Sequence, residues 1–61
     1  MRTREERIKT YRLRAEEIRT AAENMRHAES RATFLRIARD YELMADNLEG
    51  QIRRALLRKT P

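Results

Sequence analysis

The sequence predicts an all-α fold, an antiparallel hairpin of two helices. Apolar residues recur three and four positions apart in both halves of the chain, which places them along one side of a helix. Gly50 and Pro61 are the only residues that strongly disfavour a helix, while Ala, Arg, Glu and Leu dominate the remainder. With 61 residues the chain is expected to form one unit, 1–61, without room for a second domain.

The first helix is predicted over about residues 3–26. Its apolar positions alternate three and four apart, which forms the narrow stripe typical of a coiled coil. The stripe consists of Ile8, Tyr11, Ala15, Ile18, Ala22 and Met25.

The turn is predicted at about residues 26–28, because the segment 26–30 interrupts the apolar spacing and contains no bulky apolar residue. We expect the second helix to start near His27, with Glu29 in its first turn, where a carboxylate faces the positive end of the helix dipole. Since so short a turn reverses the chain, the two helices are expected to be antiparallel.

The second helix is predicted over about residues 28–58 and has the broader apolar face. Its central stripe consists of Phe34, Ala38, Tyr41, Ala45, Leu48, Ile52 and Ala55, and its flanks carry Leu35, Ile37, Met44 and Leu56. Gly50 weakens this helix, but Ile52 and Ala55 continue the stripe in phase. We therefore expect one continuous helix.

These stripes predict both the core of the hairpin and its interface with a partner. The residues assigned to core or interface are Ile8, Tyr11, Ala15, Ile18, Ala22, Met25, Phe34, Ile37, Ala38, Tyr41, Met44, Ala45, Leu48 and Ile52. Two helices bury only one face each, so an isolated hairpin is expected to be marginally stable. Self-association into a homodimeric four-helix bundle, or docking to a larger helical protein, would cover the remaining apolar positions.

Charge is segregated along the chain, whose net charge is +5: residues 1–14 carry +4, residues 15–50 carry −3 and residues 51–61 carry +4. An antiparallel hairpin brings both basic segments to one end, which suggests a site for nucleic-acid phosphates, although a solvated helix end also has such charges. The candidate anion-binding residues are Arg2, Arg4, Arg7, Lys9, Arg53, Arg54, Arg58 and Lys59. A small basic nucleic-acid-binding protein is therefore the alternative function. A membrane surface is disfavoured as the partner, because the segment 51–59 is short and has no aromatic anchor.

Several residues of opposite charge lie four positions apart, such as Arg12 with Glu16 and Arg19 with Glu23. This spacing brings the side chains together on the exposed surface of one helix. The pairs therefore predict solvated helix surface rather than a site of chemistry.

No group of side chains predicts catalysis, a cofactor or a metal. His27 follows Glu23 by four residues, whereas carboxylate-bundle iron proteins use Glu-x-x-His. A phosphate-binding loop needs more than one glycine, and the chain has no cysteine to hold a metal. We therefore expect a non-enzymatic interaction or regulatory protein with no catalytic, cofactor-binding or metal site.

Two segments carry a resemblance: YRLRAEEIRTAA at residues 11–22 and RATFLRIARDYELMA at residues 31–45. They resemble a group of small, uncharacterised helical-hairpin proteins of alphaproteobacteria, which implies a hairpin fold and a bacterial origin and no activity. In that group the turn often reads Asp-Pro-Glu, whereas this chain has His27-Ala28-Glu29.

Residues 1–14 are charged throughout and lack the apolar run of a signal peptide. No segment approaches the ~20 consecutive apolar residues that span a membrane. The sequence therefore predicts a cytoplasmic location.

Overall fold

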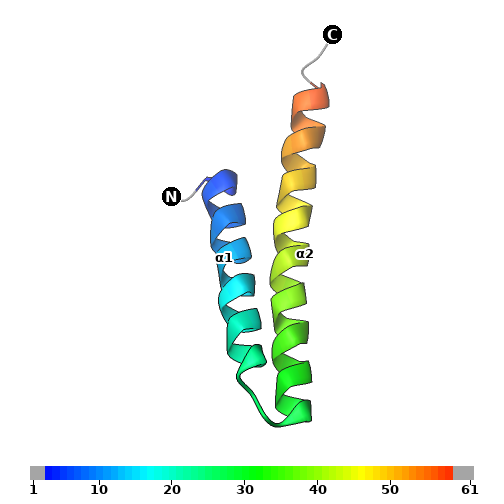
Figure 1. The fold of residues 1–61 in the computed structure, drawn as a ribbon. Helices are drawn as coiled ribbons and strands as arrows, with labels where there is room; N and C mark the ends of the chain where they lie inside the picture. The colour runs from blue at the N-terminus through cyan, green and yellow to red at the C-terminus, as the bar shows by residue number, and fades with distance from the viewer. Residues whose placement is uncertain (1–2, 59–61) are drawn as a thin grey trace.

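The chain forms two helices that run in opposite directions and pack side by side (Figure 1). The computed structural model describes residues 3–58, and these residues contain helix α1 (Arg4–Glu23), helix α2 (Ala28–Arg58) and no strand. The prediction of an all-α fold with two packed helices is therefore confirmed. The molecule is a rod of 54 × 19 × 14 Å, only one helix thick in its shortest dimension.

Helix α1 starts at an N-cap, Thr3, whose extended backbone and side chain are typical of that position. The Thr3 hydroxyl accepts a hydrogen bond of 3.1 Å from the backbone N–H of Glu6. Glu5 and Glu6 lie in the first turn, where their carboxylates face the positive end of the helix dipole. These local features define the start of α1.

Helix α1 ends at Glu23, three residues before the predicted end near residue 26. The backbone N–H of Asn24 donates to the Ala21 carbonyl at 3.2 Å, and its side-chain amide donates to the Thr20 carbonyl at 3.2 Å. Asn24 thereby satisfies carbonyls that a further helical turn would otherwise occupy. The connection is therefore residues 24–27 rather than about 26–28, even though the apolar spacing continues to Met25.

The connection is held by Arg31, which lies in the first turn of α2. Its guanidinium donates to the Met25 carbonyl from Nη2 at 2.8 Å and from Nε at 3.3 Å. The backbone N–H of Arg31 donates to the His27 carbonyl at 2.9 Å, which is the first hydrogen bond of the helical pattern in α2. His27 thus contributes its carbonyl at the helix start, and its side chain is exposed.

The buried centre of the hairpin consists almost entirely of alanine. Ala15 and Ala22 of α1 and Ala38 and Ala45 of α2 are at most 1% exposed, and Leu48 is 9% exposed. Within residues 3–58 no bulky side chain is completely buried. The alanines allow the two helix backbones to approach closely.

The larger residues predicted for the core are only partly covered by the hairpin. The half-buried ones are Ile8, Tyr11, Ile18, Met25, Phe34, Tyr41 and Ile52. Ile37 and Met44 are exposed, at 39% each, because a single antiparallel neighbour covers only the centre of the broad apolar face of α2. Within one hairpin these two residues lie on the surface, so their assignment to an interface with a partner stays a prediction.

Helix α2 continues through Gly50 to Arg58, so its last turns extend beyond the start of α1 (Figure 1). Gly50 has no positive φ, and apart from its own helix backbone and chain neighbours nothing lies within 4 Å of the place a Cβ would occupy. The helix therefore gains nothing from glycine at this position.

Replacing Gly50 with alanine is expected to stabilise the protein by about 0.5–1 kcal/mol, because alanine loses less backbone entropy on entering a helix. Thermal unfolding followed by circular dichroism at a fixed protein concentration measures the gain. Gln51→Ala is the matched control, with an expected change near zero since both residues are good helix formers. A lower melting temperature for Gly50→Ala would mean that the helix is bent or interrupted at this position.

Candidate interaction surface

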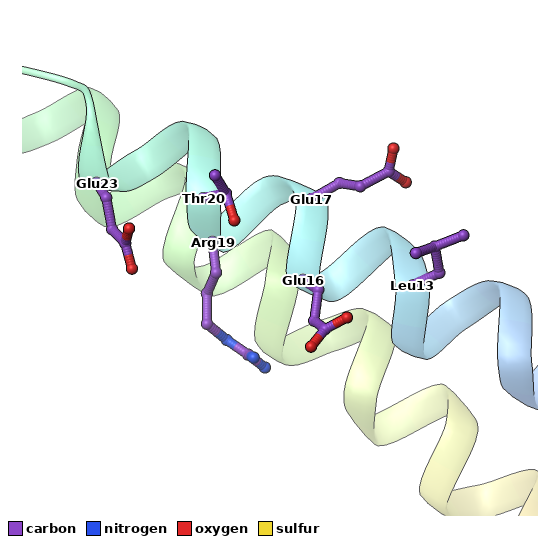
Figure 2. A pocket seen from close by; sticks show the side chains of 6 residues that line it. All are labelled: Leu13, Glu16, Glu17, Arg19, Thr20 and Glu23. Carbon is purple, nitrogen blue, oxygen red and sulfur yellow. The ribbon is translucent and has the colours of Figure 1, made fainter.

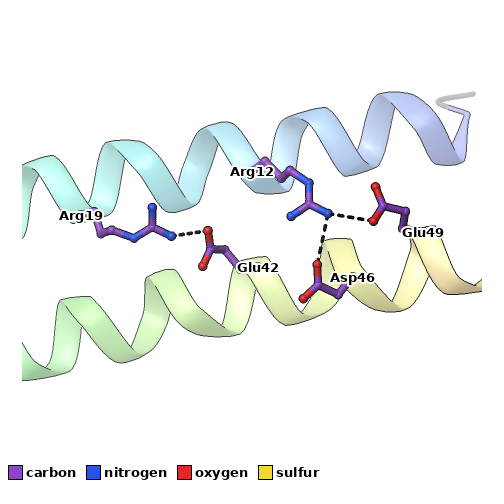
Figure 3. A network of polar contacts seen from close by, with 5 residues as sticks. All are labelled: Arg12, Arg19, Glu42, Asp46 and Glu49. Atoms are coloured by element: carbon purple, nitrogen blue, oxygen red, sulfur yellow. Dashed lines mark hydrogen bonds and ion pairs between the residues drawn. The ribbon is translucent and has the colours of Figure 1, made fainter.

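One broad side of the hairpin is covered by ion pairs that connect the two helices (Figure 3). The Nη2 atom of Arg12 lies 3.1 Å from Oδ1 of Asp46 and 3.4 Å from Oε1 of Glu49. About two turns further along α1, Arg19 pairs with Glu42. The hydrogen bond that Arg12 donates to Asp46 is the main cause that raises the pKa of Arg12 above its ordinary value.

These pairs differ from the ones expected within each helix. Arg12 and Arg19 bond across to α2 rather than to Glu16 and Glu23 of their own helix. The sequence did contain a signal for this arrangement, because the two arginines lie seven residues apart beside the apolar stripe. In coiled coils, charges at such flanking positions pair between helices and set their register and orientation.

The opposite side of the hairpin is apolar, as the geometry of each helix requires. On α2 the buried Ala45 lies between two flanks. Glu42 and Glu49 lie roughly 40–60° around the helix from Ala45 in one direction. Tyr41 and Leu48 lie equally far from it in the other direction. Around α1, Arg12 and Arg19 lie on one flank of Ala15, while Tyr11 and Ile18 lie on the other. The rings of Tyr11 and Tyr41 meet between the helices with centroids 5.9 Å apart.

We call this side the apolar face. It consists of Tyr11 and Ile18 of α1 and Phe34, Ile37, Tyr41, Met44 and Leu48 of α2. A hollow of about 190 Å³ lies on it, lined by Arg7, Tyr11, Met44, Asn47 and Leu48. The face is therefore an apolar strip with polar residues at its edges, and it contains the predicted interface residues that a single hairpin leaves exposed.

The outer surface of α1 carries a wider hollow of about 640 Å³ (Figure 2). It is lined by Leu13, Glu16, Glu17, Arg19, Thr20 and Glu23, all from one helix. The Glu17 side chain extends to a different side of the helix from those of Glu16 and Arg19, and Leu13 is 57% exposed. Side chains that spread from a single helix leave the hollow open to water, so it does not enclose a ligand.

The chemistry-bearing residues are dispersed in the structure. His27 lies beyond the end of α1, so it does not share a helical turn with Glu23. The hydroxyls of Thr10 and Thr33 donate to the carbonyls of Glu6 and Glu29, four residues earlier in their own helices. In the part of the chain that the structure describes, no three His, Cys, Asp or Glu side chains gather as a metal site would require.

The predicted anion-binding residues are separated into several places. Arg4, Arg54 and Arg58 line one hollow of about 340 Å³ where the start of α1 meets the last turns of α2. Arg7 lines the hollow on the apolar face, and Lys9 lies with Arg12 on the ion-paired side. Arg53 is exposed on α2, and Arg2 and Lys59 fall outside the described residues. Of the six predicted residues that lie within 3–58, the structure thus brings three together.

The fold and its surface define the protein as an all-α helical hairpin with one ion-paired side and one apolar face. Comparisons with protein-family models, with curated proteins and with solved structures find no match to the chain. The resemblance to alphaproteobacterial hairpin proteins therefore stays a prediction. Neither α1 nor α2 combines the length and the apolar character needed to cross a membrane.

Proposed function

We propose that this protein is a non-enzymatic interaction module that self-associates, two hairpins packing through their apolar faces into a four-helix bundle. The observation that carries the proposal is the composition of the buried centre. The hairpin fully buries only small side chains, whereas the bulky residues of the apolar face stay partly exposed, Ile37 and Met44 at 39% each. Soluble proteins that expose a continuous apolar strip of this kind typically use it as an interface.

The dimensions of the hairpin suit such an interface. Its broad side measures 54 × 19 Å, so it has room for the ~800 Å² per partner that stable protein interfaces commonly bury. Burying a large apolar side chain completely from an exposed state contributes about 1.5–3 kcal/mol, and a side chain that the hairpin already covers in part contributes a fraction of that. Covering the apolar face would thus supply the stabilisation that a core of alanines lacks.

The topology of the hairpin suits a second copy of the chain as the partner. A two-fold axis parallel to the helices would place α1 of one protomer against α2 of its partner. The same arrangement gives every helix antiparallel neighbours, as in four-helix bundles.

Thiol protection tests the proposal at single residues, because the chain has no cysteine of its own. Met44→Cys places a thiol on the apolar face, and Leu43→Cys places one on the neighbouring residue, about 100° away around α2. We expect the labelling rate of the Met44→Cys thiol to fall as protein concentration rises, while that of the Leu43→Cys thiol stays constant. Equal rates for the two thiols at all concentrations would contradict an interface on this face.

A further inference from the structure

Arg4, Arg54 and Arg58 form a basic cluster that the two helices build together. Arg4 comes from the first turn of α1, and Arg54 and Arg58 lie one turn apart on α2. With Gln51 and Ala55 they line one hollow of about 340 Å³. None of the residues lining this hollow is acidic.

The three arginines are not used to hold the fold. The ion pairs that connect the described helices belong to Arg12 and Arg19, and the cluster takes part in none of them. Glu5 and Glu6 stand in the same first turn as Arg4, yet neither lines the hollow. Three like charges gathered without a counter-charge repel one another and raise the local potential, which an anion would relieve.

We propose that this basic cluster binds the phosphate backbone of duplex nucleic acid. Guanidinium groups match phosphate oxygens with paired hydrogen bonds, and arginine is the residue most suited to that contact. No aromatic side chain lines the hollow, so there is no surface on which an unpaired base could stack. Contacts to phosphates alone fix position and carry no sequence information, so the binding is independent of base sequence.

The end of α2 is less suited to a membrane surface. Leu56 and Leu57 are its most exposed apolar residues, at 65% and 68%, and Arg53 lies one helical turn before them on the same side of the helix. This basic residue thus borders a patch of only two leucines, and no aromatic anchor accompanies them. Duplex nucleic acid is therefore the polyanion that the cluster fits better.

Fluorescence anisotropy with a labelled 20-base-pair DNA duplex, titrated with the full chain over a series of salt concentrations, tests this proposal. Three phosphate contacts predict that log K falls with log salt concentration with a slope of about −2.7. In the Arg54→Gln/Arg58→Gln variant we expect binding at low salt to weaken by at least tenfold and the slope to shrink by about 2. This readout is separate from self-association, since neither residue belongs to the apolar face.

The matched control is Arg36→Gln/Arg39→Gln, which removes the same two charges from exposed positions of α2. We expect its duplex affinity to change by less than about threefold, and circular dichroism should show all three proteins equally helical. Equal losses in both double variants would overturn the proposal, because binding would then follow net charge alone. Binding to vesicles of phosphatidylglycerol without binding to the duplex would overturn it in favour of a lipid surface, and absence of binding to the duplex at low salt would also overturn it.

Discussion

Replacing Ala38 with glutamate is expected to unfold the hairpin. Ala38 is 1% exposed and lies in the alanine centre between α1 and α2. A carboxylate placed there would lose its hydration without gaining a cationic partner, which costs several kilocalories per mole. Because the hairpin buries little else, we expect most of the helical circular dichroism signal to disappear at 25 °C.

Ala32→Glu is the matched control for this substitution. Ala32 lies on the same helix but is exposed, so the same side chain would stay hydrated there. We expect the control variant to keep its helicity and to melt within a few degrees of the unchanged protein. An Ala38→Glu variant with the melting temperature and mass of the unchanged protein would show that Ala38 is not at a helix interface.

Replacing Met44 with glutamate is expected to dissociate the assembly. Met44 is 39% exposed in the hairpin and lies beside Arg7, so a glutamate at this position is tolerated within one hairpin. Between two apolar faces the same carboxylate would be desolvated, which strongly disfavours the bundle. We expect light scattering to report half the mass of the unchanged protein, together with a lower melting temperature that no longer depends on concentration.

Leu43→Glu is the control for dissociation. Leu43 is 50% exposed and adjacent in sequence, but it points away from both the apolar face and α1. The same substitution there should leave the mass unchanged. If Leu43→Glu dissociated the assembly and Met44→Glu did not, the interface would lie on the outer side of α2.

The sequence was sufficient to predict the elements of the fold, because periodicity alone places apolar residues on one side of each helix. Ala15, Ala22, Ala38, Ala45 and Leu48 were all assigned to the core from their spacing, and all are buried. The end of α1 was harder to predict, because it depends on hydrogen bonds. Met25 continues the apolar spacing, yet Asn24 ends the helix by satisfying carbonyls of the preceding turn.

The distribution of charge was only partly predictable, because it depends on the rotation of each helix about its axis. Topology alone brings the two basic ends of the chain together, and Arg4 does meet Arg54 and Arg58. It does not specify that Lys9 lies on the ion-paired side, away from that cluster. The residues that share a surface could be identified only from the contact between the two helices.

The most direct test of self-association is the mass of the protein by light scattering, measured with its helical melting curve over a hundredfold range of concentration. Self-association predicts a dimer, with twice the mass of the chain, whose melting temperature rises with concentration because association stabilises the folded state. A helical monomer with a melting temperature independent of concentration would contradict it, and would show that the alanine centre alone stabilises the hairpin. A poorly helical monomer would also contradict it, and would indicate a larger helical protein as the partner of the apolar face.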